Sequence, residues 1–174
     1  MPQFARKQRG FTLIEAVLSL SILIIISSYA APQLMQLRAY FESKAAQQSL
    51  LTFIASARAR ALYRQDIVTI CPLDNNKICS TDWNQPLSIF VDSNSNAVLD
   101  SDEILSSIWN KKNGQVNISW VRGRRYIRFR PNGSTTATTG SLKYCLATSV
   151  DKFNFRLVIA RTGRTRVDRK NHGC

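Results

Sequence analysis

The sequence predicts an α+β protein, in which one long N-terminal helix precedes a head of antiparallel β-sheet. Two observations predict this fold class. An apolar run begins at Phe11 and passes into apolar spacing of three to four residues that lasts to Tyr63, as in a helix. Beyond Gln65, apolar and polar side chains alternate as they do in strands. The 174 residues suit one ordinary domain with an appendage, and a hydrophobic content of 44% suffices for a core.

The chain begins with a basic stretch that leads into the apolar run. Arg6, Lys7 and Arg9 precede the run without any acidic residue, and residues 16–31 carry no charge. Residues 11–31 are enough to cross a hydrocarbon core of ~30 Å as a helix. The preceding positive charge predicts a cytoplasmic N-terminus, with the bulk of the chain outside the cytoplasm. A cleaved secretory signal is the alternative, for which Ser28-Tyr29-Ala30 is a weak cleavage site.

One carboxylate interrupts the apolar run, at Glu15. A carboxylate inside a membrane costs ~2.5–3.5 kcal/mol on insertion scales and needs a partner. A free N-terminal amine on a neighbouring copy of the helix would supply one, if the chain were cut before Phe11.

The residues Arg9-Gly10-Phe11-Thr12-Leu13-Ile14-Glu15 resemble the leader-peptide junction of type IV pilins and type II secretion pseudopilins. The resemblance implies that a prepilin peptidase cuts between Gly10 and Phe11 and methylates Phe11. It also implies that Glu15 guides assembly with other pilins, and that Pro32 kinks the helix. The chain would start in the bacterial inner membrane, with its head in the periplasm, and then join a surface pilus. A single-pass anchor with a chance match is the alternative.

The helical pattern continues beyond Pro32 as an amphipathic stripe, formed by Ala46, Leu50, Phe53, Ile54, Ala57 and Ala61. We therefore expect one helix over 11–63, kinked but not ended by the proline. The predicted parts are a leader (1–10), an apolar helical half (11–32), an amphipathic half (33–64) and a β-rich head with a basic tail (65–174).

Alternating patterns predict the strands of the head: Ile67–Ile70, Leu87–Val91, Glu103–Ile108, Val116–Val121, Tyr126–Arg130, Leu142–Ala147 and Phe153–Ala160. Turn residues separate several of them, at Asn113-Gly114, Pro131-Asn132-Gly133 and Thr162-Gly163. The polar segment Ser134–Ser141 is predicted to be a mobile loop.

Short motifs in the head extend the resemblance over nearly the whole chain. Trp83, Ile89–Asp92, Phe129–Gly133 and Gly163–Arg166 resemble the GspH/FimT class of minor pilins. The resemblance implies the pilin fold.

Four cysteines suit an oxidising compartment such as the periplasm, and they allow three pairings. Cys71 and Cys79 flank a short segment and are predicted to close a small loop. Cys145 would then pair with Cys174 and tie the C-terminal tail to the sheet. A metal site at cysteine is disfavoured because the sequence holds no CxxC pair and a single histidine, His172.

Oxygen-bearing side chains follow the strand at 87–91 with the spacing of an EF-hand loop: Asp92, Asn94, Asn96, Asp100 and Glu103. Ala97 stands where that loop requires glycine, and no helix is predicted on either side. A loop capped by its own side chains is the favoured interpretation, and a weak calcium site is the alternative. No other metal and no cofactor is predicted.

Positive charge gathers in the last third of the chain. The net charge is +13, and residues 121–174 hold 13 basic and 2 acidic side chains. Such an excess favours a polyanionic partner. The best candidate site is the tail, with Arg161, Gly163, Arg164, Arg166, Arg169 and Lys170. In the family class that the head resembles, the G-R-x-R tail is associated with DNA capture, which maps onto Gly163, Arg164 and Arg166.

A second basic segment is the strand around 126–130. If Ile127 and Phe129 face the core, alternation places Arg128 and Arg130 on an exposed stripe that continues from Arg124. The stripe is either an auxiliary phosphate-contact surface or a solvated sheet face.

No catalytic motif is present, so an enzyme is not expected. We interpret the chain as a minor pilin that binds DNA without sequence preference through its tail and supports DNA uptake in natural transformation. A structural minor pilin or type II pseudopilin without DNA binding is the main alternative. An adhesin for an acidic surface polymer shares the same charge logic.

Overall fold

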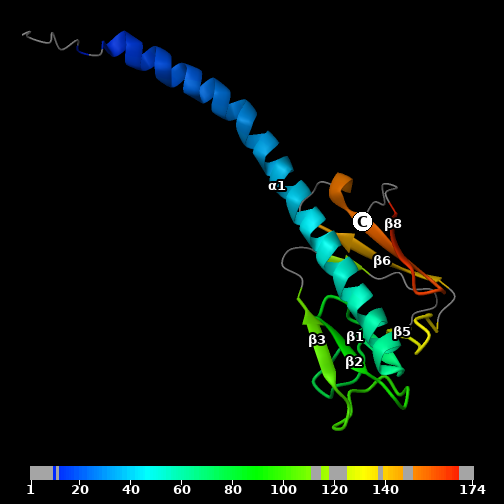
Figure 1. Ribbon diagram of the computed structural model, residues 1–174. Coiled ribbons are helices and arrows are strands. Elements are labelled where there is room, and N and C mark those ends of the chain that lie inside the picture. Colours follow the sequence, from blue (N-terminus) through cyan, green and yellow to red (C-terminus); the bar gives the residue numbers. More distant parts are fainter. Residues whose placement is uncertain are drawn as a thin grey trace, which may run out of the picture. The chain divides into compact units, whose positions relative to one another are not determined.

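The computed structural model describes residues 10, 12–110, 115–117, 125–136, 139–146 and 151–168, with the side chains of 115–117 and 151 left out. They form one long helix, α1 (Leu13–Arg64), followed by a head of β-strands (Figure 1). The chain divides into two compact units, residues 1–38 and residues 39–174.

In the first unit, α1 exposes its large apolar side chains, among them Leu20, Ile24 and Leu34. This part of the helix has a mean hydropathy of 2.1 and is long and apolar enough to cross a membrane. Its serines donate their hydroxyl hydrogens to backbone carbonyls three residues earlier, as Ser21 does to Leu18 at 2.8 Å. These bonds satisfy the hydroxyls without water, which suits a hydrocarbon environment.

The course of α1 at Pro32 and the positions of its two ends can be compared with the predicted helix. The helix runs on through Pro32, as the sequence predicts. It begins at Leu13, where the Glu15 backbone N–H donates to the Thr12 hydroxyl at 3.4 Å, while Phe11 lies outside the described residues. The helix ends at Arg64, because Gln65 has a φ of 55° and turns the backbone away.

In the second unit, the helix buries one stripe of side chains against the head: Ala39, Ser43, Leu50, Phe53, Ile54, Ala57 and Ala61. The predicted amphipathic stripe is therefore confirmed, except that Ala46 is only partly buried. Ser43 is the one polar member of this set, and its hydroxyl donates to the Phe153 carbonyl at 2.5 Å. A buried hydroxyl that has a partner avoids most of its desolvation cost.

The strands of the head form two four-stranded antiparallel sheets. The first has the order β3-β2-β1-β5 and the second the order β4-β6-β7-β8. The first sheet contains β1 (Val68–Pro72), β2 (Leu87–Val91), β3 (Leu105–Trp109) and β5 (Ile127–Phe129). The second contains β4 (Gln115–Asn117), β6 (Thr139–Cys145), β7 (Phe155–Ala160) and β8 (Thr165–Asp168), and the short helix η1 (Asp151–Phe153) precedes β7.

One hydrophobic core joins the helix to both sheets. Leu50 from α1, Ile70 and Ile89 from the first sheet, and Leu142 and Leu157 from the second are all at most 1% exposed. Each such side chain stabilises the fold by roughly 1.5–3 kcal/mol when it leaves water. A smaller cluster beside β1 and β2 packs Phe90, Ala97 and Leu99 around Cys71 and Cys79.

The observed strands match most of the predicted ones within one to three residues, but two differences affect the site. The predicted mobile loop Ser134–Ser141 differs from the structure at two places. Its last three residues belong to β6, which begins at Thr139. Thr135 is buried, with only 2% of its surface exposed. Strand β8 was not predicted as a strand. At β6 and at β8, pairing with β7 supplies the backbone hydrogen bonds, so tertiary context decides the conformation. Of the predicted strand 116–121, only 116 and 117 are described.

Candidate functional site

The β7–β8 hairpin holds the predicted glycine-arginine motif in a tight turn. The Gly163 N–H donates to the Ala160 carbonyl at 2.8 Å, and the Ala160 N–H donates to the Arg164 carbonyl at 2.9 Å. Gly163 has a φ of 76°, a left-handed conformation that side chains disfavour. Three residues, Arg161 to Gly163, therefore close the hairpin, with glycine at the left-handed position.

A second turn of the same kind follows β5. The Gly133 N–H donates to the Arg130 carbonyl and the Arg130 N–H to the Ser134 carbonyl, both at 2.8 Å. Gly133 has a φ of 72°. The Asn132 side-chain oxygen accepts from the Ser134 N–H at 3.0 Å and from its hydroxyl at 2.7 Å. Both family-like motifs, residues 129–133 and 163–166, thus contain a glycine that the backbone requires.

The two turns lie against each other and against α1. The Thr135 N–H donates to the Arg161 carbonyl at 2.8 Å. Arg58 of α1 donates through Nε to the Gly133 carbonyl at 3.0 Å. A Cβ on Gly163 would overlap the Gly133 carbonyl oxygen, so the backbones are in close contact. We call residues 130–135 and 160–164, together with Arg58, the two-turn platform.

Exposed arginines lie on the two-turn platform and directly after it. Arg130, Arg161, Arg164 and Arg166 are all exposed, and none of them forms an ion pair with another described residue. Thr165 is less exposed than its two neighbours, which is the alternation of an extended segment. Arg124, Arg169 and Lys170, which the sequence also assigns to the site, lie outside the described residues.

The register of the second sheet adds two basic residues that the sequence analysis missed. Lys143 of β6 pairs with Arg156 of β7, which pairs with Asp168 of β8. This row lies on the sheet face opposite the core, because Phe155, Leu157 and Ile159 fill the inner positions of β7. Arg166 lies on the same outer face, opposite Val158. The alternation of β7 could have identified Arg156 as outward-facing, but only the register places Lys143 beside it.

Two family models match this chain. The model described as type II transport protein GspH matches residues 46–163, which is more than half of the chain. The model described as a prokaryotic N-terminal methylation motif matches residues 5–31. The chain belongs to the GspH family. It is a minor pilin or pseudopilin, a structural protein and not an enzyme. Family membership implies processing by prepilin peptidase and assembly with other pilins, and the motif and apolar helix are consistent with inner-membrane anchoring beforehand.

Solved structures share the fold of this GspH-family chain. Two crystal structures of the type IV minor pilin FimU of Pseudomonas aeruginosa match with TM-scores of 0.55 and 0.56 and identities of 19% and 20%. The matches cover 75% and 76% of this chain and 96% and 92% of the FimU chains. The minor pseudopilin EpsH from the Type 2 Secretion System of Vibrio cholerae matches with a TM-score of 0.51 at 11% identity, over 73% of this chain and 96% of EpsH. Comparison with curated proteins gives no match.

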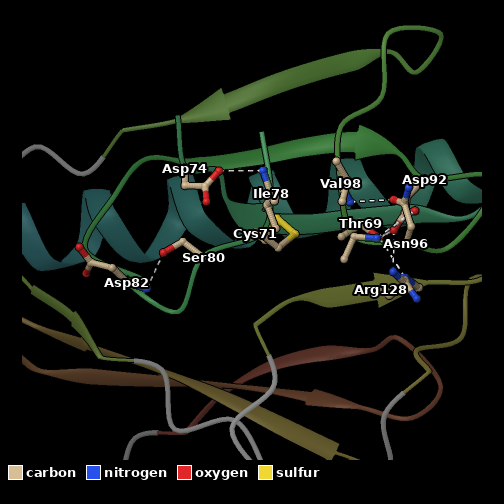
Figure 2. The surroundings of a disulfide bond; sticks show 12 residues. Thr69, Cys71, Asp74, Ile78, Ser80, Asp82, Asp92, Asn96, Val98 and Arg128 are labelled. Carbon is tan, nitrogen blue, oxygen red and sulfur yellow. Dashed lines mark hydrogen bonds and ion pairs between the residues drawn. A yellow bond between two sulfur atoms is a disulfide. The ribbon is translucent and has the colours of Figure 1, made fainter. Parts of the chain in front are cut away.

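The predicted exposed stripe at 126–130 of the GspH-family chain is wrong for Arg128. This side chain is 8% exposed, and its guanidinium lies 2.6 Å from the Asp92 carboxylate in an ion pair (Figure 2). It also donates through Nε to the Thr69 hydroxyl at 3.0 Å and packs on the Tyr126 ring. All three residues of β5 are buried, so neither face of this strand is open to solvent. Arg128 is therefore a structural residue, and Arg130 alone of the stripe is seen to be exposed.

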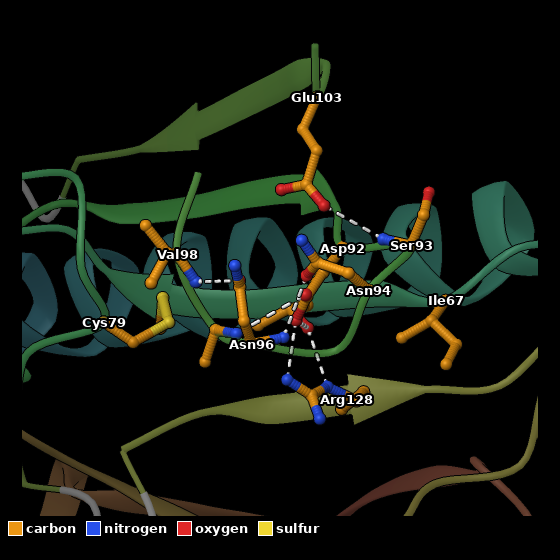
Figure 3. Close-up of polar contacts among 12 residues, drawn as sticks. Ile67, Cys79, Asp92, Ser93, Asn94, Asn96, Val98, Glu103 and Arg128 are labelled. Carbon is orange, nitrogen blue, oxygen red and sulfur yellow. Dashed lines mark hydrogen bonds and ion pairs between the residues drawn. A yellow bond between two sulfur atoms is a disulfide. The ribbon is translucent and has the colours of Figure 1, made fainter. Parts of the chain in front are cut away.

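The loop after β2 is capped by its own side chains, as the favoured interpretation of its sequence predicts. Glu103 accepts from the Ser93 N–H (Figure 3) and from the Asp100 N–H. Asp100 accepts from the amides of Asn94 and Asn96. Ala97 has a φ of 61°, at the position where a calcium loop has glycine.

The first candidate calcium ligand of this loop is already engaged. Asp92 is buried and binds Arg128 and Thr69, and its other oxygen accepts from the Ala97 N–H at 3.4 Å. Burial raises the pKa of Glu103. Across the part of the chain that the structure describes, no group of three or more His, Cys, Asp or Glu side chains is placed to hold a metal ion.

One of the two predicted disulfides is confirmed. Cys71 and Cys79 are bonded, and their Cα atoms lie 5.5 Å apart (Figure 2). The other predicted pair, Cys145 with Cys174, includes a residue outside the described ranges and stays a prediction.

Proposed function

We propose that this GspH-family minor pilin binds DNA without sequence preference and supports DNA uptake in natural transformation. One observation carries the proposal. Arg161, Arg164 and Arg166 are exposed on one ordered hairpin, free of ion pairs to the described residues. Arg130 joins them from the neighbouring turn. We include Arg169, Lys170 and Arg124 because of their sequence proximity.

Phosphate groups are the chemistry that this arrangement suits. A guanidinium fork matches phosphate oxygens with two parallel hydrogen bonds. The hairpin is held by backbone hydrogen bonds and by the close contact with Gly133, so little chain entropy is lost when it binds. Contacts to phosphates alone do not distinguish base sequences and weaken steeply with salt. Because the proposed contacts are made by guanidinium groups to phosphates, the binding is expected to be non-specific.

The N-terminal half would bring this site to the cell surface. In our proposal, prepilin peptidase cuts between Gly10 and Phe11 and methylates Phe11. Glu15 then guides entry into the filament, and Pro32 bends the inserted helix. Retraction of the filament would carry bound DNA inward.

The test is a binding measurement on the full chain in nonionic detergent, by fluorescence anisotropy with labelled duplexes of unrelated sequence. Micromolar, salt-dependent affinity for every duplex is the expected result. The double substitution Arg164→Gln with Arg166→Gln should remove most of the binding and lower the salt slope by about 1–2. The matched control, Lys77→Gln with Lys152→Gln, removes the same charge from exposed sites outside the two-turn platform and should change the affinity little.

The alternative is a structural role in filament assembly without DNA binding. The family match favours this alternative only in one respect: the matched region ends at Gly163, before Arg164 and Arg166. Unchanged binding by the arginine double variant, or no binding by the wild type, would support this alternative. Binding to heparin but not to DNA would instead support an adhesin for an acidic polymer.

A further inference from the structure

A groove runs along the two-turn platform, between α1 and the β7–β8 hairpin. Its volume is about 450 Å³, which lies within the range of small-ligand sites, ~300–1,000 Å³. The described lining includes Gln48 and Thr52 from the helix and Gly163 and Thr165 from the hairpin. Among the described residues that line it, Arg58 and Arg164 are the only charged ones, and none is a carboxylate. Such a lining suits an anion.

We propose that Arg58 is a phosphate-binding residue, and that this groove takes one phosphodiester group of the DNA that the hairpin holds. The inference rests on the proposed function and extends it to a residue of the helix. It also gives the bound strand a path, from the outer face of the second sheet, over the hairpin, to the helix.

Arg58 is oriented before any ligand arrives. Its Nε donates to the Gly133 carbonyl at 3.0 Å. A Cβ at Gly163 would stand 2.9 Å from Nε and 3.2 Å from Cδ, so the side chain packs directly on the hairpin backbone. One hydrogen bond and this close packing restrict the guanidinium to one plane, which reduces the entropy lost when it binds a ligand.

The far end of the Arg58 guanidinium remains available. The two terminal nitrogens hydrogen-bond to no described residue, and neither is a buried atom without a partner. They can therefore donate together to two oxygens of one phosphate. Arg164 is exposed on the hairpin side of the groove and supplies a second cation, and the Thr52 and Thr165 hydroxyls supply neutral donors.

This arrangement also explains why a glycine precedes the arginine of the tail motif. Any side chain at position 163 would overlap the Gly133 carbonyl and press on Arg58. Position 163 therefore requires glycine for two reasons: its φ is left-handed, and the Arg58 side chain occupies the space that a Cβ would need.

The test compares Arg58→Gln and Arg58→Lys with Arg60→Gln, which removes a positive charge two residues away on the same helix. All variants are measured as full chains in nonionic detergent, with a labelled duplex over a range of salt concentrations. Arg58→Gln should raise Kd about tenfold and lower the salt slope by ~0.7–0.9, the loss of one phosphate contact. Arg58→Lys should keep the slope and weaken binding less, and Arg60→Gln should resemble the wild type.

A second readout separates contact from positioning. In nuclear magnetic resonance spectra, the Arg58 Nε–H signal should shift on titration with a 5′-phosphorylated dinucleotide, and Arg164→Gln should weaken this shift. If Arg58→Gln raises Kd with an unchanged salt slope, the residue only positions the hairpin and the proposal is overturned.

The possible results of the binding test also distinguish the role of Arg58 from the proposed function. If Arg58→Gln binds as the wild type does while the Arg164 and Arg166 double variant fails, Arg58 has no role and the proposed function stands. If the wild type binds no DNA, the proposed function itself falls, and this inference with it.

Discussion

The backbone of Gly163 packs directly on the carbonyl oxygen of Gly133. Gly133 lies in the turn that follows β5 of the first sheet and Gly163 in the turn that follows β7 of the second, and each has a positive φ. The contact holds the turn that contains Arg161 and Arg164 against the turn that follows Arg130, and Arg58 packs on both glycines.

Gly163→Ala should destabilise the head more than Gly133→Ala does. At Gly163 a Cβ would overlap a backbone oxygen, whereas at Gly133 it would meet side-chain atoms of Leu62 and Arg58 at 3.1–3.2 Å, which need to move by only a few tenths of an ångström. Gly133→Ala should therefore cost about 1–2 kcal/mol, the penalty of the left-handed conformation alone. Gly163→Ala should cost more than about 3 kcal/mol, since the backbone itself must move. Urea unfolding of both variants measures the difference, and equal losses would contradict the described contact.

Arg128→Met should destabilise the protein by about 3–5 kcal/mol, because it leaves the buried Asp92 carboxylate without its counter-charge. Arg130→Gln, two residues along the chain, removes the same charge from an exposed side chain and should change stability by less than about 0.5 kcal/mol. Thermal and urea unfolding provide the comparison. Similar stabilities for the two variants would mean that Arg128 is not the buried partner of Asp92.

The disulfide between Cys71 and Cys79 should stabilise the head by about 2–3 kcal/mol, as expected for a loop with a sequence separation of 8. Replacing both cysteines by alanine should lower the free energy of unfolding by this amount. DNA affinity should stay at the wild-type value, because the small loop lies on the first sheet, outside the two-turn platform. Peptide mapping under non-reducing conditions checks the pairing, and a fragment that links Cys71 to Cys145 would refute it.

Gly10→Ala should block processing of the precursor without disturbing the fold. A Cβ at this position meets nothing within 4 Å, so any effect arises from recognition by the peptidase. Intact-mass measurement in cells that express prepilin peptidase should find the unprocessed precursor. Glu15→Gln serves as the control, since it should be processed normally but assemble poorly. Normal processing of Gly10→Ala would place the cleavage elsewhere.

Much of the fold could be predicted from local patterns. The apolar stripe of α1 depends on neighbours three or four residues away, and the burial of its positions confirmed it. The strand β2 was also predicted with its correct bounds, but all five of its residues are buried, so its two faces do not alternate in burial. The bond between Cys71 and Cys79 was predicted for the same reason, since the two residues are close in the chain. Strand β8 was missed because its extended form depends on pairing with β7.

In the candidate site too, local patterns predicted some features, while others depend on contacts between distant residues. Exposure of Arg161, Arg164 and Arg166 followed from their place in a polar, basic segment. Burial of Arg128 did not follow from alternation, because β5 is covered on both faces and the partner Asp92 is 36 residues away. Arg58 gave no signal at all, as it is one of several arginines on an amphipathic helix.

An apolar N-terminal helix, a β-rich head and a surplus of positive charge at the C-terminal end could all be predicted from the sequence. These features depend on composition and short-range spacing. Only the tertiary structure decided which arginines face solvent and that Gly133, Gly163 and Arg58 meet. The bond from Arg58 to Gly133 spans 75 residues, and no periodic pattern records a contact that only chain packing creates.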